Sequence, residues 1–197
     1  FLPSPRVAHA ALAEIVDRGL TLVSMQSLLF GVSGAELFGD TKARANLGRG
    51  MERAIALAGR FGIPNLVFGS PSQRCVPEGL SIDQALDQAT DVFRSFAAAA
   101  QSAGTKISIE VNPATYGTNF LNTLDDVLHF VARVDHPAVV SILDLGAMHM
   151  NGDFATTAAR IPALLPRLNH VHVSEPNLAP APHDAAALAP VIEALRM

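Results

Sequence analysis

The sequence predicts an α/β protein whose parallel β-sheet is built from strands that alternate with helices along the chain. Short runs of β-branched residues alternate with longer segments in which apolar residues recur every three or four positions. Successive runs are spaced by roughly 30–45 residues, the length of one βα unit. Several runs also end in acidic or imidazole side chains, at the sheet edge where such proteins bind ligands.

Five segments are predicted to be strands. The clearest is 106–112, in which Ile107, Ile109 and Val111 alternate with smaller or polar residues, as in a buried strand. Because helices are predicted between the strands, the connections are right-handed crossovers and the strands run parallel. The other four predicted strands are 20–26, 65–70, 139–144 and 170–175.

Amphipathic helices are predicted in the intervals. The first covers 7–18 and stops at Gly19. Asp40 is placed to cap the second helix, and Ser81 with Gln84 has the form of a capping box that begins the third. The remaining expectations are a helix that begins at Thr123, a loop around Gly146 and Gly152, a helix at 154–165 and a final helix that ends near residue 197.

Two α/β folds fit this alternation, namely an open doubly wound sheet of five strands and a (β/α)8 barrel of which only part lies in the sequence. A closed barrel typically needs ~250 residues, whereas this chain has 197 residues and room for five strands at the observed spacing. The spacing alone does not separate the two folds. In both, residues 1–197 form a single domain that binds ligands at the carboxyl ends of its strands.

The composition is that of a globular domain. Of the 197 residues, 49% are hydrophobic and 16% charged, which excludes a disordered chain. The net charge is −4 and Lys and Arg form no block, so we expect no nucleic-acid partner. No apolar run approaches the ~20 residues of a membrane span, and no membrane association is expected. The single cysteine, Cys75, cannot form an internal disulfide, which favours a cytoplasmic location.

Three successive strands deliver a metal-ligand side chain to the same rim. Glu110, Asp144 and His172 each lie at the carboxyl end of a predicted strand, where a carboxylate is costly unless it has a partner. Carboxylate and imidazole donors without thiolate suit Mn²⁺, Mg²⁺, Co²⁺ or Zn²⁺. The alternative is that each carboxylate caps a helix or binds backbone amides. The sequence thus predicts that these three side chains converge on one divalent metal ion.

Other polar residues near the strand ends are candidate substrate contacts. Asn112 ends its strand. His149 follows Asp144 by five residues and is either a substrate contact or a solvated loop histidine. His170 and His172 flank one residue and are predicted to face the same way, with His170 deeper in the sheet. Glu175 has the opposite parity and is expected in the loop that follows.

Arg74 is a fourth candidate substrate contact. It follows the second predicted strand, where its fork of donors could hold a phosphate or carboxylate, or form a salt bridge on the surface. The sequence contains no GxGxxG or GxxxxGK[ST] loop, so nucleotide binding has no support. No serine stands in a G-x-S-x-G setting, which argues against a serine hydrolase.

Short motifs at the strand ends follow one another in a recognisable order. They are Ile109-Glu110-Val-Asn112, Asn119-Phe-Leu-Asn-Thr123, Leu143-Asp144 and His170-Val-His172-Val-Ser-Glu175, and Leu66-Val-Phe-Gly-Ser-Pro71 with Arg74 precedes them. Together they resemble the sugar phosphate isomerase/epimerase family, whose xylose isomerase-like TIM barrels include ketose 3-epimerases and endonuclease IV. The resemblance covers most of the chain from Leu20 onward and concerns the fold and metal site more than the substrate.

This resemblance implies a (β/α)8 barrel in which the five visible strands are the third to the seventh. In the epimerases of the family, Glu, Asp, His and a second Glu on the last four strands hold a divalent metal. The first three ligands correspond to Glu110, Asp144 and His172. The second Glu is then expected on an eighth strand after Met197, and the first two strands before Phe1. We therefore expect the natural polypeptide to extend beyond both ends of this sequence.

The residues that surround the metal depart from the family pattern. The epimerases carry a further Glu six residues past the first ligand, where this chain has Tyr116. They carry His three residues past the Asp, where this chain has Ala147, and Arg six residues past the His, where it has Leu178. The substrate-holding shell is therefore different, and ketose 3-epimerase activity in particular is not expected.

The sequence favours a metal-dependent isomerase or epimerase that acts on a small sugar, sugar phosphate or related hydroxy-carbonyl compound through an enediolate. Glu110, or the Glu expected on the eighth strand, would be the base. One alternative is a metal-dependent hydrolase of the endonuclease IV type, which the acidic chain disfavours. The other is a non-catalytic binding module that retains the barrel. A homo-oligomer is compatible with all three hypotheses.

Overall fold

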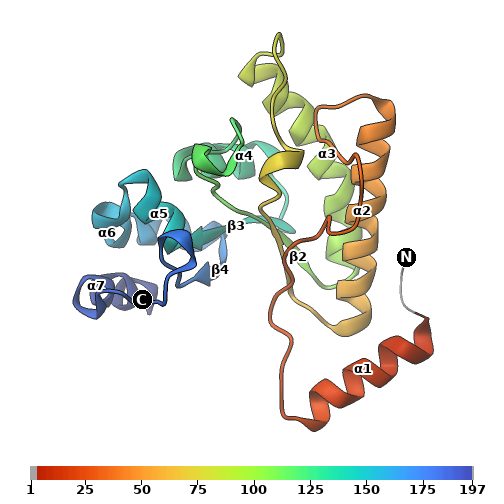
Figure 1. Ribbon diagram of the computed structural model, residues 1–197, viewed down its shortest axis with the longest axis horizontal. Coiled ribbons are helices and arrows are strands. Elements are labelled where there is room, and N and C mark those ends of the chain that lie inside the picture. Colours follow the sequence, from red (N-terminus) through yellow and green to blue (C-terminus); the bar gives the residue numbers. More distant parts are fainter. Residues whose placement is uncertain (1–3, 197) are drawn as a thin grey trace.

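The computed structural model describes residues 4–196, in which a curved parallel sheet has helices packed along its outer face (Figure 1). The strands are β1 (Asn65–Phe68), β2 (Lys106–Ile109), β3 (Val139–Asp144) and β4 (Leu168–His172). The helices are α1 (Pro5–Asp17), α2 (Thr41–Phe61), α3 (Ile82–Ser102), α4 (Leu124–Val134), α5 (Leu145–Asn151), α6 (Phe154–Leu164) and α7 (Ala185–Leu195).

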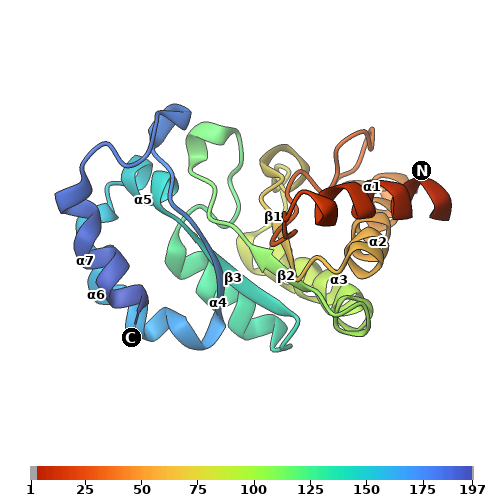
Figure 2. The ribbon, with the colours of Figure 1, turned by 90° about the horizontal axis from the view of Figure 1, so that it is seen from below.

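The strand order identifies the sheet as part of a barrel. The strands lie in the order β1-β2-β3-β4, and each neighbouring pair is parallel. A doubly wound sheet reverses its winding direction at a switch point, and this sheet does not, so that alternative is wrong. Helices α2, α3 and α4 pack on β1, β2 and β3 in turn, and Figure 2 shows them following one another around the sheet.

A polar cluster on the inner face shows how strongly the sheet curves. Asn169 of β4 donates from its side-chain amide to the Oδ1 of Asn65 of β1 at 2.8 Å. Three strand spacings separate β1 from β4, which would place them ~14 Å apart in a flat sheet. Ser108 of β2 donates to the same Oδ1, and the Asn65 amide donates to the hydroxyl of Ser24 at 2.8 Å. The inner face therefore closes on itself through these hydrogen bonds.

Residues 20–26 lie beside β1, but the predicted strand there is wrong. Pairing with β1 is limited to a single parallel bridge at Met25. Leu20 and Val23 are each 59% exposed. The segment therefore lacks the packing on both faces that sustains a strand in a parallel sheet.

The segment after β3 is helical, and the loop predicted around Gly146 and Gly152 is wrong. Helix α5 begins directly after Asp144, whose carboxylate accepts a hydrogen bond from the Ala147 N–H at 2.7 Å. Position 146 of this helix has no room for a side chain, because a Cβ there would lie 2.9 Å from the Oγ of Ser174. Gly152 ends the helix in the left-handed conformation with φ of 78°.

The hydrophobic core lies between the sheet and the helices. Phe93 of α3 contacts Phe68 of β1 and Phe130 of α4 edge to face, with ring centroids 4.9 and 5.4 Å apart. Burial of this layer fixes the sheet against the helices and leaves the inner face free for polar residues. Within the described residues, no helix has the length and apolar character needed to cross a bilayer.

The predicted starts of α2, α3 and α4 are confirmed, whereas α1 begins at Pro5, two residues before the predicted start. The Asp40 carboxylate accepts a hydrogen bond from a backbone N–H in the first turn of α2. Ser81 and Gln84 form both hydrogen bonds of a capping box at α3, and Thr123 does the same with Asp126 at α4.

Replacing Ser81 by Ala should lower the free energy of unfolding by about 1 kcal/mol, because α3 then loses its side-chain cap. Ser95 is the matched control, since it lies exposed within α3 and its hydroxyl donates only to the Val92 carbonyl of the same helix. Ser95→Ala should change the same quantity by less than about 0.5 kcal/mol. Urea denaturation measures both, and equal losses would contradict the capping role.

Candidate metal centre

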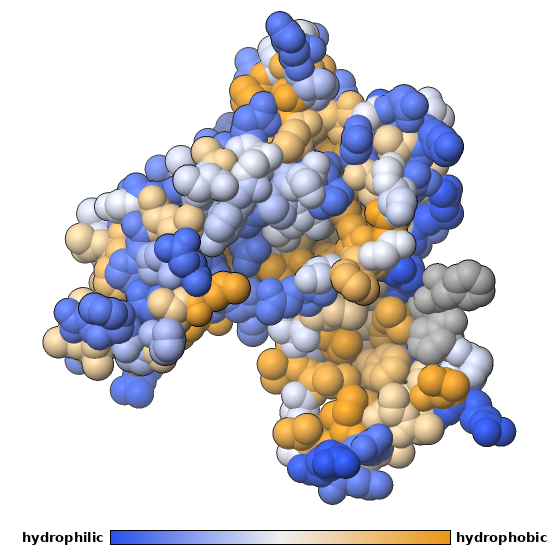
Figure 3. Space-filling model, in the orientation of Figure 1, coloured by the Kyte–Doolittle hydropathy of each residue, from blue (hydrophilic) through white to orange (hydrophobic). Residues whose placement is uncertain are grey.

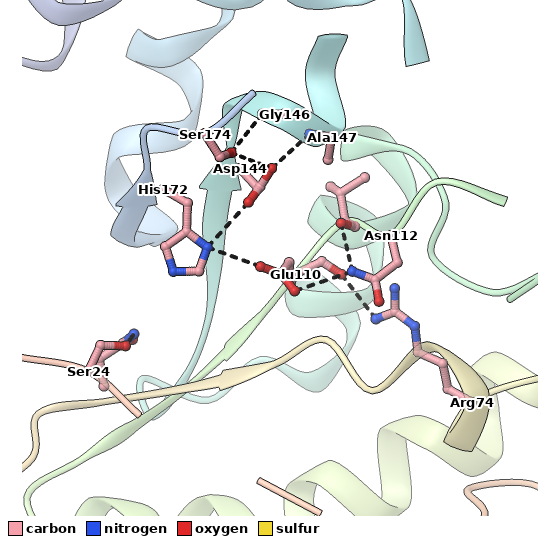
Figure 4. Close-up of polar contacts among 11 residues, drawn as sticks. Ser24, Arg74, Glu110, Asn112, Asp144, Gly146, Ala147, His172 and Ser174 are labelled. Carbon is pink, nitrogen blue, oxygen red and sulfur yellow. Dashed lines mark hydrogen bonds and ion pairs between the residues drawn. The ribbon is translucent and has the colours of Figure 1, made fainter. Parts of the chain in front are cut away.

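Three neighbouring strands end in side chains that meet at the rim of the sheet (Figure 4). Glu110 follows β2, while Asp144 and His172 are the last residues of β3 and β4. The Nδ1 of His172 lies 3.2 Å from the Glu110 Oε1 and 3.3 Å from the Asp144 Oδ2. One donor atom from each residue lies within 4.8 Å of the other two. The three side chains therefore converge, as their positions at the strand ends predict.

The two oxygens of the Asp144 carboxylate have different partners. Its Oδ1 accepts hydrogen bonds from the Ala147 N–H at 2.7 Å and from the Ser174 hydroxyl at 3.0 Å. The Ser174 hydroxyl in turn accepts from the Gly146 N–H at 2.9 Å. Asp144 thus caps α5, which was the alternative interpretation, and its Oδ2 still faces His172. The cap fixes the orientation of the carboxylate.

The Glu110 carboxylate is positioned by two neighbours on the inner face. Asn112 donates from its amide to the Glu110 Oε2 at 3.3 Å and to the Val111 carbonyl at 2.9 Å. Gly69, directly after β1, has no side chain, and a Cβ at this position would overlap the Glu110 Oε2. Neither Gly69 nor Ser174 was predicted from the sequence as a site residue. A glycine placed directly after a buried strand was the available signal for Gly69.

The cluster carries its own positive charge. Hydrogen bonds to Asp144 and then Glu110 raise the pKa of His172 to about 9 despite partial burial. Burial acts to raise the pKa of Asp144, but hydrogen bonds from His172, the Ala147 N–H and Ser174 outweigh it, and the pKa is lowered overall. A cation between two carboxylates therefore stabilises the site. A divalent ion suits the same donors, provided that His172 releases its proton.

The three residues face a cavity of about 1200 Å³ on the inner side of the sheet. Asn112 lines this cavity beside Glu110, so it is placed to reach a bound molecule. The positions at which the chain departs from the family pattern also line it. They are Tyr116, Ala147 and Leu178.

Arg74 lies beneath the site, fully buried. Its guanidinium donates to the backbone carbonyls of Glu110 at 3.0 Å and Leu121 at 3.4 Å. Burial lowers the pKa of Arg74 to about 10, so it remains charged at neutral pH. The alternative prediction that Arg74 forms a salt bridge on the surface is wrong, because the side chain is buried. Without an exposed surface, the side chain holds the chain segment that carries Glu110 and does not reach the cavity.

The structure places His149 and Glu175 away from the three converging residues. They line a separate cavity of about 180 Å³, where the His149 Nε2 lies 3.8 Å from the Glu175 Oε2. The His149 ring stacks on Phe154 with centroids 3.7 Å apart, and Glu175 accepts a hydrogen bond from the His183 N–H at 2.8 Å. The contact between these side chains therefore connects helix α5 to the segment that follows β4.

A comparison with protein families gives one match that spans most of the chain. The model of the family described as xylose isomerase-like TIM barrel matches residues 2–186. No curated protein matches the chain in sequence.

Solved structures share this fold at low sequence identity. A 3-keto-D-glucoside 4-epimerase from E. coli superposes with a TM-score of 0.78 at 19% identity, over 98% of this chain and 73% of that protein. A D-psicose 3-epimerase from Clostridium cellulolyticum H10 gives 0.80 at 17% identity, over 98% and 66%. A xylose isomerase domain protein from Planctomyces limnophilus gives 0.70 at 14%, over 98% and 72%. At these identities the likeness concerns the fold alone.

In metal-free buffer, His172 should stabilise the folded protein fully below pH 6.5 and lose this contribution as the pH rises toward about 9. The sign follows because the folded-state pKa is raised, so between these values the unfolded chain releases a proton that the folded chain keeps. The contribution is on the order of 2 kcal/mol. Urea denaturation across this pH range should show the loss in the wild type and in His170→Gln, and a flatter profile in His172→Gln. A profile that is unchanged in His172→Gln refutes the assignment.

Replacing Gly69 by Ala should lower the free energy of unfolding by about 1–3 kcal/mol, because the added methyl group forces the Glu110 carboxylate to move. The pKa of His172, measured by NMR, should fall at the same time, since it loses one of its partners. Gly48 in α2 is the control, because a Cβ there meets no atom within 4 Å. Gly48→Ala should be neutral or stabilising and leave His172 unchanged. Similar effects of both changes would exclude the steric argument.

Proposed function

Since the chain belongs to the xylose isomerase-like TIM barrel family, we propose that it is a metal-dependent isomerase or epimerase of a small hydroxy-carbonyl compound. The observation that carries this proposal is the convergence of Glu110, Asp144 and His172 in one cavity. The fold is shared with a 3-keto-D-glucoside 4-epimerase, a D-psicose 3-epimerase and an L-ribulose 3-epimerase. Each of these proteins is 19% identical to the chain, so the residues of the site are the stronger guide to the substrate.

Glu110, Asp144 and His172 would hold a divalent ion, for which Mn²⁺, Mg²⁺, Co²⁺ and Zn²⁺ are suitable. When bound, such an ion supplies positive charge that stabilises negative charge developing on the substrate oxygens. The hydrogen bonds from Ser174 and the Ala147 N–H keep the Asp144 carboxylate in place for this role.

Glu110 is the proposed base. It would accept the proton from the carbon next to the carbonyl, and the electrons of the broken C–H bond would move to the carbonyl oxygen to give an enediolate. Return of the proton from Glu110 to the neighbouring carbon gives an isomer. An epimer forms when water donates a proton to the opposite face of the same carbon, while Glu110 keeps the proton that it removed. Asn112 donates to the Glu110 Oε2 and so fixes its direction. A positioned base contributes a factor of ~10²–10⁴.

The charges of the cavity favour a neutral substrate over a phosphorylated one. Among the described residues, the charged side chains that line the cavity belong to Glu110, Asp144 and His172, and no Lys or Arg lines it. Arg74 is enclosed behind the site and already binds two carbonyl oxygens. A phosphate group would therefore face carboxylates without a cationic partner. The same absence of cationic side chains, with the net charge of −4, argues against a nuclease.

The proposal is tested with the purified protein and Mn²⁺ by NMR detection of proton exchange into D₂O. A panel of free aldoses, ketoses and keto-glycosides should include substrates, whereas their phosphorylated counterparts should react at least ~10-fold more slowly. Glu110→Gln should lower the rate by ~10²–10⁴-fold. Glu78, exposed in a loop, gives the control Glu78→Gln, which should retain the wild-type rate. Equal rates for wild type and Glu110→Gln would refute Glu110 as the base, and exchange of no compound in the panel would refute the proposed function.

A further inference from the structure

Where the two strands pair, Leu168–His172 of β4 contains one residue more than Ser141–Asp144 of β3. Ser141 pairs with Leu168, but the next residue, Ile142, pairs with His170. Asn169 is therefore left without a partner on β3, which is the geometry of a β-bulge. Bulges of this kind change the face toward which the following side chains point.

The bulge decides which side chain faces Asp144. In a regular strand continued from Leu168, the residue opposite Asp144 would be Val171, because each step along β3 would match one step along β4. With the bulge, His172 is opposite Asp144. Leu168 and Val171 both pack against the hydrophobic core, although an odd spacing separates them. The bulge thus allows Leu168 and Val171 to pack on the core while His172 lies opposite Asp144.

A side-chain hydrogen bond connects the bulge in β4 to β1, at the other edge of the sheet. The Asn169 amide donates to the Oδ1 of Asn65 at 2.8 Å. Asn65 is only 2% exposed and is itself held by Ser24 and Ser108. Figure 4 shows Ser24 on the side of the site away from Asp144. The acceptor for Asn169 is therefore fixed independently of β4.

We propose that Asn169 is a positioning residue that holds His172 in the metal centre. The unpaired backbone of Asn169 creates the change of face, and its amide prevents β4 from sliding into regular register. Without the hydrogen bond, the regular register competes, and in that register Val171 takes the place of His172 opposite Asp144. The metal readout of this proposal depends on the proposed function, whereas the register of β4 does not.

The test compares Asn169→Ala with Ser108→Ala. Both remove one hydrogen bond to the Asn65 Oδ1, but Ser108 lies in β2, where pairing is regular. Calorimetric titration with Mn²⁺ should show affinity lowered ~10- to 100-fold in Asn169→Ala, the range for residues that orient a ligand. Ser108→Ala should stay within about twofold of the wild type. Asn169→Ser, whose side chain is too short to reach Asn65, replaces the alanine variant if that variant does not fold.

Wild-type affinity in Asn169→Ala, or an equal loss in Ser108→Ala, overturns the proposal. If the wild type itself binds no Mn²⁺, the metal function fails, and the proposal is then decided by crystal structures of the wild type and Asn169→Ala. Val171, or a mixture of Val171 and His172, opposite Asp144 in the variant supports the positioning role. An unchanged register, with His172 alone opposite Asp144, refutes it.

Discussion

The pairing of one imidazole with two carboxylates is the interaction on which the rest of the site depends. Glu110 and Asp144 would repel each other at the rim if no positive charge lay between them. His172 provides that charge in the metal-free site, because hydrogen bonds to Asp144 and then Glu110 raise its pKa to about 9. Because each group comes from a different strand, the balance requires β2, β3 and β4 to be adjacent, parallel and in the observed register.

The surroundings restrict each member of this cluster to one orientation. The start of α5 and Ser174 hold the Asp144 carboxylate, and Asn112 holds Glu110. Arg74 secures the backbone of Glu110 from below, with its charge directed to carbonyl oxygens and away from the cavity. Among the described residues that line the cavity, positive charge is therefore limited to His172. Under the proposed function, this distribution of charge favours a divalent ion and a neutral substrate.

The polar inner face explains why the sheet curves. On the outer face, the sheet packs against the helices through hydrophobic side chains. On the inner face, the Asn65 Oδ1 accepts hydrogen bonds from Ser108 of β2 and Asn169 of β4. The bond from Asn169 joins β4 to β1, which are not neighbours in the sheet, so it forms only in a closed or strongly curved sheet. In this family fold, the same inner face also directs the strand ends toward a common centre.

The sequence by itself determined the four strands that form, the starts of α2, α3 and α4, and the three residues that converge, because alternation, capping residues and strand-end carboxylates are local signals. Tertiary structure decided what depends on distant neighbours. The segment 20–26 lacks a second packing partner and forms no strand, while Ser174, from the segment after β4, accepts a hydrogen bond from the Gly146 N–H at the start of α5. Strand order, which separates a barrel from a doubly wound sheet, and the burial of Arg74 arise from pairing across the chain. The bulge at Asn169 belongs to the same class, because the face that a side chain occupies depends on the register of the neighbouring strand.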